Sequence, residues 1–306
     1  MKFHKILFKV LIALFYITLF TCQVKAFAFS FIYIFPHRFI YLKNKTYIIQ
    51  KNDTLVDLAV TFEVGYYHLT LANPKIDPWV PKPKKKIIIP YQILIPQEFS
   101  KYFHSKSYII INLPEMKLYY FRFPKLFVFP IGVGDVGRLP DPGIYKIIKK
   151  KKDPFWYPPP SIKAEDPTLP DVVPPGPNNP MGKYALYLSR GLYAIHGTNK
   201  IYSIGRRSTH GCIRLYPQHI KFLYNNVTVG TTVQIVYEPY KLAVENKNIY
   251  IQAYEDIEKR IKHPIFYIIK KLDKLIKHQN YQINLLKLEK ILKNPDGLIY
   301  KIGKIK

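Results

Sequence analysis

The spacing of apolar and polar positions predicts a small α/β unit near the start of the chain, between residues 46 and 95. Tyr47-Ile48-Ile49-Gln50 and Ile87-Ile88-Ile89-Pro90 are short β-branched runs typical of strands. Asn52-Asp53-Thr54 supplies a turn and a helix N-cap, and Asn73-Pro74 ends a second helix. The first helix carries its apolar residues at helical spacing, at Leu55, Leu58, Ala59 and Phe62. The expected order is strand, helix, helix, strand.

Residues 107–238 predict a mainly β domain. Seven β-branched or aromatic runs are separated by Gly and Pro, at Tyr108–Asn112, Leu118–Phe121, Leu126–Val133, Ile144–Lys149, Ala185–Leu188, Tyr193–Ile195 and Thr232–Tyr237. The segment Asp153–Pro180 is too rich in proline to be a central strand. A long loop inside a compact domain is usually functional, so we expect a lid or a substrate wall there, with a plain linker as the alternative.

Residues 264–306 predict a helical C-terminal extension. Pro264 suits a helix start, and an apolar stripe follows at Ile265, Ile268, Ile269, Leu272 and Ile276. A second helix around Ile283 and Leu286 ends at Asn294-Pro295-Asp296-Gly297. We expect the two helices to pack on the mainly β domain, and a tail that binds a membrane surface or a partner is the alternative.

The N-terminus has the features of a secretory signal. Lys2, Lys5 and Lys9 precede a charge-free apolar run over 10–20, and Ala26 and Ala28 offer cleavage after residue 26 or 28. An uncleaved anchor helix is the alternative, although the run is shorter than the roughly 20 residues that span a bilayer. The net charge of +27 suits an anionic partner, which could be nucleic acid, a carboxylate-rich polymer or a membrane. Export would separate the protein from nucleic acid, so that partner is disfavoured.

One cysteine remains after the signal, and its surroundings favour chemistry. Cys212 lies in Ser208-Thr209-His210-Gly211-Cys212-Ile213-Arg214-Leu215, and His196 precedes it in Ala194-Ile195-His196-Gly197-Thr198. An unpaired exported cysteine is a reactive thiol to be explained. Nucleophilic acyl transfer by cysteine requires a thiol, a nearby base and backbone N–H donors for the oxyanion.

Each neighbour of Cys212 has an expected role. Thr209 and His210 can orient the base or hold the loop, and the amides of Gly211 and Cys212 can form an oxyanion hole. Arg214 suits a substrate carboxylate. A zinc site is disfavoured, because one cysteine and two histidines supply three ligands at most without the paired spacing of structural sites.

These motifs resemble two known families. The string from Ile195 to Leu215 resembles the YkuD-type L,D-transpeptidases, and Pro177-Asn178-Asn179-Pro180-Met181-Gly182 is similar to their approach to the strand before the base. The 46–95 unit resembles a LysM domain, through Asp53-Thr54-Leu55, Ala59, Ala72-Asn73-Pro74 and Ile87-Ile88-Ile89-Pro90. It lacks the usual glycine at Asn52 and another before its last strand.

The resemblance implies a periplasmic enzyme with a β-sandwich catalytic domain and no metal or cofactor. Cys212 would be the nucleophile and His196 the proton donor and acceptor. The thiolate would attack the amide after diaminopimelate in a peptidoglycan stem tetrapeptide and expel D-alanine. The acyl group would pass to a second diaminopimelate or to a lysine of a Braun-type lipoprotein. Two alternatives stay open, namely transfer to water by a carboxypeptidase or lipoprotein-detaching amidase, and a non-catalytic protein that binds the wall.

Overall fold

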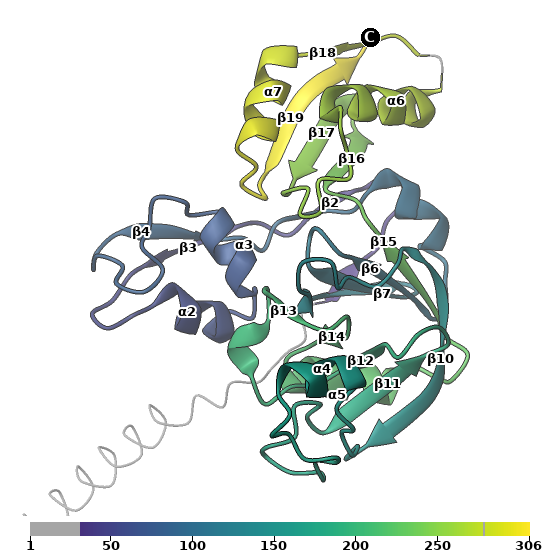
Figure 1. Cartoon of the computed structure of the whole chain (residues 1–306). Coiled ribbons are helices and arrows are strands. Elements are labelled where there is room, and N and C mark those ends of the chain that lie inside the picture. Colours follow the sequence, from purple (N-terminus) through teal and green to yellow (C-terminus); the bar gives the residue numbers. More distant parts are fainter. Residues whose placement is uncertain (1–30, 278) are drawn as a thin grey trace, which may run out of the picture. The chain divides into compact units, whose positions relative to one another are not determined.

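The computed structural model describes residues 31–277 and 279–306 of the chain (Figure 1). The predicted signal peptide, residues 1–26, and its two cleavage positions lie outside the described residues. Within the described part of the chain, no helix has both the length and the apolar composition needed to cross a membrane.

A nine-stranded sheet forms the centre of the catalytic domain. Its order is β1-β8-β7-β6-β15-β10-β11-β12-β14, with β6–β15 and β12–β14 parallel and the other pairs antiparallel. The strands in chain order are β1 (Phe31–Tyr33), β6 (Tyr108–Asn112), β7 (Lys117–Arg122), β8 (Lys125–Pro130), β10 (Gly143–Lys152), β11 (Tyr184–Leu188), β12 (Ala194–His196), β14 (Ile213–Arg214) and β15 (Thr232–Val236). The mainly β prediction for this region is confirmed.

The long strand β10 connects the two halves of this sheet. Its first residues pair with β15, and its later residues pair with β11 after a register shift between Ile147 and Lys149. An irregularity of this kind bends a strand and increases its twist. The second half of the sheet, which carries β12 and β14, is thereby turned relative to the first.

Short elements complete the catalytic domain around β12 and β14. A small parallel pair joins β9 to β13, and α5 packs against β11. These elements are β9 (Val133–Gly134), α4 (Pro160–Glu165), the 3-10 helix η2 (Ile201–Ser203), β13 (Arg207–Thr209) and α5 (Pro217–Asn226). The Pro-rich segment predicted as a loop contains α4.

The N-terminal α/β unit has the predicted element order. It contains β3 (Lys45–Ile48), α2 (Leu55–Thr61), α3 (Tyr66–Leu71) and β4 (Lys86–Ile89), and the two strands are antiparallel. The Thr54 side chain caps α2 by accepting the Asp57 N–H at 3.0 Å. Leu55, Leu58 and Ala59 are buried in its core, as the helical spacing predicts. The unit is referred to below as the LysM-like unit.

The LysM-like unit contacts the connection between β12 and β13 through backbone hydrogen bonds. The Tyr66 and Tyr67 amides donate to the carbonyls of Ile204 and Gly205, each at 3.1 Å. Gly205 has φ +76°, and a Cβ there would lie 2.5 Å from the Tyr66 nitrogen. Only glycine tolerates both the conformation and the close approach, so the sequence is adapted to hold this unit against the catalytic domain.

The predicted helical C-terminal extension is wrong in part, because residues 240–306 form a mixed α/β unit. The two predicted helices are present as α6 (Pro264–Ile276) and α7 (Leu285–Lys293). They cover a four-stranded sheet of order β16-β17-β19-β18 and do not pack as a helical pair on the catalytic domain. Its strands are β16 (Tyr240–Glu245), β17 (Asn248–Ala253), β18 (Tyr281–Ile283) and β19 (Ile299–Ile305).

The apolar stripe of α6 explains this arrangement. Ile268, Leu272 and Ile276 are buried in one cluster with Ile249 and Ile251 of β17. The stripe identified in the sequence therefore faces the unit's own sheet, and its burial stabilises the fold of the unit.

A buried charged cluster joins the three units. Glu115, fully buried at the β6–β7 turn, accepts a hydrogen bond of 2.5 Å from Lys241 of β16 and one of 2.7 Å from Tyr119. Its backbone carbonyl lies 2.7 Å from Nε2 of His68 in α3. Lys117 lies 3.6 Å from the same carboxylate. Burial lowers the pKa of Lys241, whereas the lysine charges outweigh burial and lower the pKa of Glu115.

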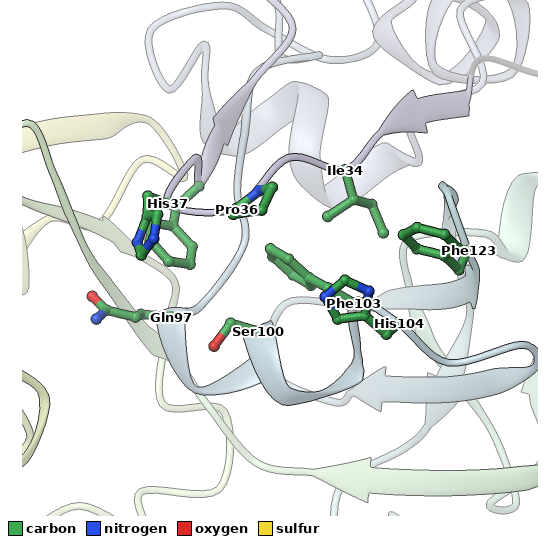
Figure 2. A pocket seen from close by; sticks show the side chains of 9 residues that line it. Ile34, Pro36, His37, Gln97, Ser100, Phe103, His104 and Phe123 are labelled. Carbon is green, nitrogen blue, oxygen red and sulfur yellow. The ribbon is translucent and has the colours of Figure 1, made fainter.

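Residues 34–39 cross over the 3-10 helix η1 (Gln97–Tyr102) and enclose an aromatic cavity of about 280 Å³. Figure 2 shows Phe103 and His104, which follow η1, below Ile34 and Pro36. The nearby two-stranded pair of β2 (Ile40–Tyr41) and β5 (Ile93–Leu94) extends the same apolar core. None of the residues that line this cavity is a predicted site residue.

Candidate active site

Cys212 immediately precedes β14, and its thiol is free in the described part of the chain. Its sulfur lies 3.9 Å from the Leu192 carbonyl oxygen. Burial raises the pKa of the Cys212 thiol, although a backbone hydrogen bond to Ala194 and the charge of Arg214 partly oppose this shift. Burial therefore favours the neutral form of the Cys212 thiol, and a neighbouring base would be needed to ionise it.

His196 ends β12 and is suited to be that base. It is buried, and its Nδ1 lies 2.6 Å from the Gly197 carbonyl oxygen. A carbonyl only accepts, so the contact with Gly197 places the proton on Nδ1, and in the neutral ring the lone pair is then on Nε2. Burial and, secondarily, the charge of Arg214 lower the pKa of His196 to about 4. The imidazole is neutral near pH 7.

Thr209 organises the turn that carries Cys212. Its hydroxyl donates to the Cys212 carbonyl at 2.7 Å and accepts the Gly211 N–H at 3.1 Å. This differs from the expectation for Gly211, because its amide is engaged by Thr209 and does not point to an oxyanion. Gly211 has φ +108°, and a Cβ there would lie 2.6 Å from Cε1 of Tyr193. Glycine is required at this position by both conformation and space.

His210 contacts two charged residues that the sequence analysis did not single out. Its Nε2 lies 3.0 Å from Oε2 of Glu165, the last residue of α4, and it also contacts the Arg138 guanidinium. Arg138 in turn donates to Glu165 at 2.5 Å. Hydrogen bonds from Arg138 and His210 hold the pKa of Glu165 below its usual range.

Arg214 lies on β14 directly across from His196 on β12. Its backbone exchanges two hydrogen bonds of 2.9 Å with Gly132, which fixes the strand. Its buried Nε has no hydrogen-bond partner among the described residues. Arg214 therefore places a positive charge beside both the thiol and the imidazole.

A cavity of about 280 Å³ brings the predicted residues together, with α4 beside β12 and β14 (Figure 1). Its lining includes five of the six predicted site residues, namely His196, Thr209, His210, Cys212 and Arg214. Part of the Pro-rich segment forms one wall, through Trp156, Pro159, Ser161 and Ile162. The segment therefore lines the cavity that holds the predicted site residues, and its role as a substrate wall stays a prediction.

Asn179 holds the base of this wall. Its buried amide donates to the carbonyls of Pro154, Val173 and Pro174 at 2.9 to 3.2 Å, and its oxygen accepts the Met181 N–H. The Pro177–Gly182 string thus stabilises the segment in addition to leading into β11. No pattern in the sequence identifies Arg138 and Glu165 as site residues, because their contact depends on how the Pro-rich segment folds back.

Known proteins with similar sequences belong to one enzyme family. Residues 106–235 match the family model for the YkuD L,D-transpeptidase catalytic domain. The chain is 41% identical over 214 residues to the probable L,D-transpeptidase YbiS of Escherichia coli, covering 66% of this chain and 67% of that protein. The chain belongs to the YkuD family of L,D-transpeptidases. It is an L,D-transpeptidase enzyme of the same kind as these relatives.

Two further relatives extend the likeness beyond the catalytic domain of this L,D-transpeptidase. Probable L,D-transpeptidase ErfK/SrfK of Escherichia coli is 40% identical over 198 residues, covering 62% of each chain. Probable L,D-transpeptidase YcfS is 35% identical over 231 residues, covering 72% of this chain and 70% of that protein. These stretches are longer than the matched catalytic domain, so the similarity continues into flanking residues.

Proposed function

We propose that this L,D-transpeptidase forms a cysteine acyl-enzyme on a peptidoglycan stem tetrapeptide. The observation that carries the proposal is the neutral His196, with an unprotonated Nε2, in the same cavity as the unpaired Cys212. A neutral imidazole accepts the thiol proton as sulfur attacks, which is the role of a general base.

The proposed first step breaks the amide between diaminopimelate and D-alanine. The Cys212 sulfur bonds to the diaminopimelate carbonyl carbon, and His196 takes the thiol proton. The carbon–nitrogen bond then breaks, and the same proton leaves on the D-alanine amine. In the second step an amine attacks the thioester, loses its proton to His196, and returns the thiol. No metal or cofactor takes part in these steps.

The proposed acceptor is an amine, either a second diaminopimelate or a lysine of a Braun-type lipoprotein. The same acyl-enzyme with water as acceptor gives the alternative hydrolase. We also propose that the enzyme is exported to the periplasm and that the LysM-like unit binds the wall glycan. Trp79 is 60% exposed on this unit, and the Arg206 guanidinium of the catalytic domain lies near both Trp79 and Tyr66.

The test is mass spectrometry of products made from a defined stem tetrapeptide with each acceptor amine present in turn. A product that has lost D-alanine and gained the acceptor identifies the transferase and its acceptor. Tripeptide alone identifies the hydrolase. Cys212→Ala is the control, and products from that variant equal to the wild-type yield would contradict the acyl-enzyme.

A further inference from the structure

The contact of Arg138, His210 and Glu165 lies at the rim of the active-site cavity. His210 lines the cavity, and Ser161 and Ile162 of α4 line it one turn before Glu165. The carboxylate of Glu165 accepts from Arg138 through both oxygens, at 2.5 and 3.4 Å, and contacts Nε2 of His210 at 3.0 Å. Two nitrogenous groups thus hold one carboxylate beside the reacting thiol.

Arg138 and His210 are held in place without Glu165. The strands that precede them, β9 and β13, pair in parallel, and the Asp135 amide donates to the Thr209 carbonyl at 2.9 Å. Gly134 allows the turn to close, since a Cβ there would lie 2.1 Å from the Arg138 carbonyl oxygen. Arg138 and His210 are therefore positioned by the same paired strands that position Cys212.

Glu165 belongs to a segment that has few hydrogen bonds to the rest of the domain. Residues 157–172 form an arch whose base is closed by the Trp156 and Val173 backbones, with bonds of 2.9 and 2.8 Å. Among the described residues, the side-chain hydrogen bonds that join this arch to the rest of the domain all involve the carboxylate of Glu165. Breaking them would remove the polar contacts that hold the cavity wall formed by Pro159, Ser161 and Ile162.

We propose that Arg138 and His210 form the site for a free carboxylate of the donor stem peptide, and that Glu165 occupies this site until the substrate replaces it. The proposal rests on the proposed function, which supplies a substrate with a terminal and a diaminopimelate carboxylate. Exchange of one carboxylate for another keeps the charged hydrogen bonds, so opening the arch costs little when an acid binds. A donor without that carboxylate has to break the bonds of Glu165 without replacement.

The test measures binding to Cys212→Ala protein, so it does not depend on turnover. Three peptides are compared by calorimetry: the free tetrapeptide, its D-alanine amide, and its diaminopimelate side-chain amide. We expect one amide to bind about three- to tenfold more weakly than the free acid, a range set by the partial exposure of the site. The amide that loses affinity identifies which carboxylate is bound.

Two variants should change the binding of the free acid in opposite directions. Arg138→Gln should abolish the preference for the free acid, while Glu165→Gln should strengthen binding of the free acid about three- to tenfold. Asp171→Asn, which removes an exposed carboxylate of the same arch, is the matched control and should change neither. Equal binding of all three peptides, or weaker binding of the free acid to Glu165→Gln, would overturn the proposal. Failure of the wild type to release D-alanine would instead contradict only the proposed function.

Discussion

His196 and Arg214 are register partners on the parallel strands β12 and β14, so a buried imidazole and a guanidinium lie side by side in the candidate active site. This relationship predicts the pH dependence of acylation. The imidazole works as a base only when neutral, and its pKa is about 4. Acylation by tetrapeptide should therefore stay level as pH falls from 7 to 5 and decline only near pH 4.

The measurement is the initial rate of acyl-enzyme formation by intact-protein mass spectrometry across that range. Arg214→Gln removes the secondary cause of the low pKa, so the acidic decline should move to higher pH. Circular dichroism at each pH controls for unfolding. A wild-type midpoint near the ordinary histidine value of about 6.5 would contradict the burial of a neutral base.

Loss of the Cys212 thiol should stop acylation, whereas loss of the His196 imidazole should slow it. Cys212→Ala should abolish covalent addition of the tetrapeptide. His196→Ala should slow acylation by roughly 10²- to 10⁴-fold, which is the usual contribution of general acid–base catalysis. His210→Ala should cost less, since that ring contacts Glu165 and Arg138. A larger loss for His210→Ala than for His196→Ala would reassign the base.

Gly211→Ala should reduce acylation at least tenfold without unfolding the protein. The added Cβ would lie 2.6 Å from the Tyr193 ring, and the positive φ adds strain of about 1 kcal/mol. The Thr209–Cys212 turn must then shift, and misplacement of a nucleophile is costly. Gly230→Ala is the matched control, because that glycine also has positive φ but open space around it. Equal loss in both variants would show that strain alone is responsible.

Lys241→Met should destabilise the protein by about 3 kcal/mol, because it leaves the fully buried Glu115 without its closest cation. The nearby Lys117 keeps the effect at the low end of the range for broken buried pairs. Adding Glu115→Gln should recover part of the loss. Urea unfolding measures each variant. Lys163→Met, which breaks an exposed pair with Asp171, should change stability by less than about 0.5 kcal/mol.

Trp79→Ala should weaken pelleting with purified peptidoglycan sacculi while leaving the free energy of unfolding nearly unchanged. The ring is 60% exposed, so its loss removes little buried area, yet an exposed aromatic face suits a sugar surface. Phe266→Ala is the control, since Phe266 is 67% exposed on the C-terminal unit. Equal pelleting of wild type and Trp79→Ala would remove Trp79 from the proposed glycan surface.

The sequence predicted what depends on local patterns. The seven apolar runs of the catalytic domain correspond to strands, and the helical spacing of Leu55, Leu58 and Ala59 located α2. The motif residues around Cys212 and His196 meet in one cavity because β12 and β14 pair.

What the sequence did not predict depends on contacts between distant residues. The sequence did not predict the strand β19, because Ile299–Ile305 lacks a strict alternation of apolar and polar residues and the helices before it suggested a helical end to the chain. Arg138 and Glu165 are 27 residues apart and meet only after the Pro-rich segment folds back. The Glu115–Lys241 pair needs both the catalytic domain and the C-terminal unit, and the contact of His68 with the Glu115 carbonyl also needs the LysM-like unit.

The shared position of Glu115 limits how this enzyme can be divided. A recombinant fragment confined to residues 106–235 would keep Glu115 and Lys117 but lose Lys241 and His68. Water would replace Lys241 beside the Glu115 carboxylate. The apolar surfaces that now contact the LysM-like unit and the C-terminal unit would be exposed and would favour aggregation. The smallest unit suitable for biochemical or inhibitor work is therefore the assembly from β1 through β19.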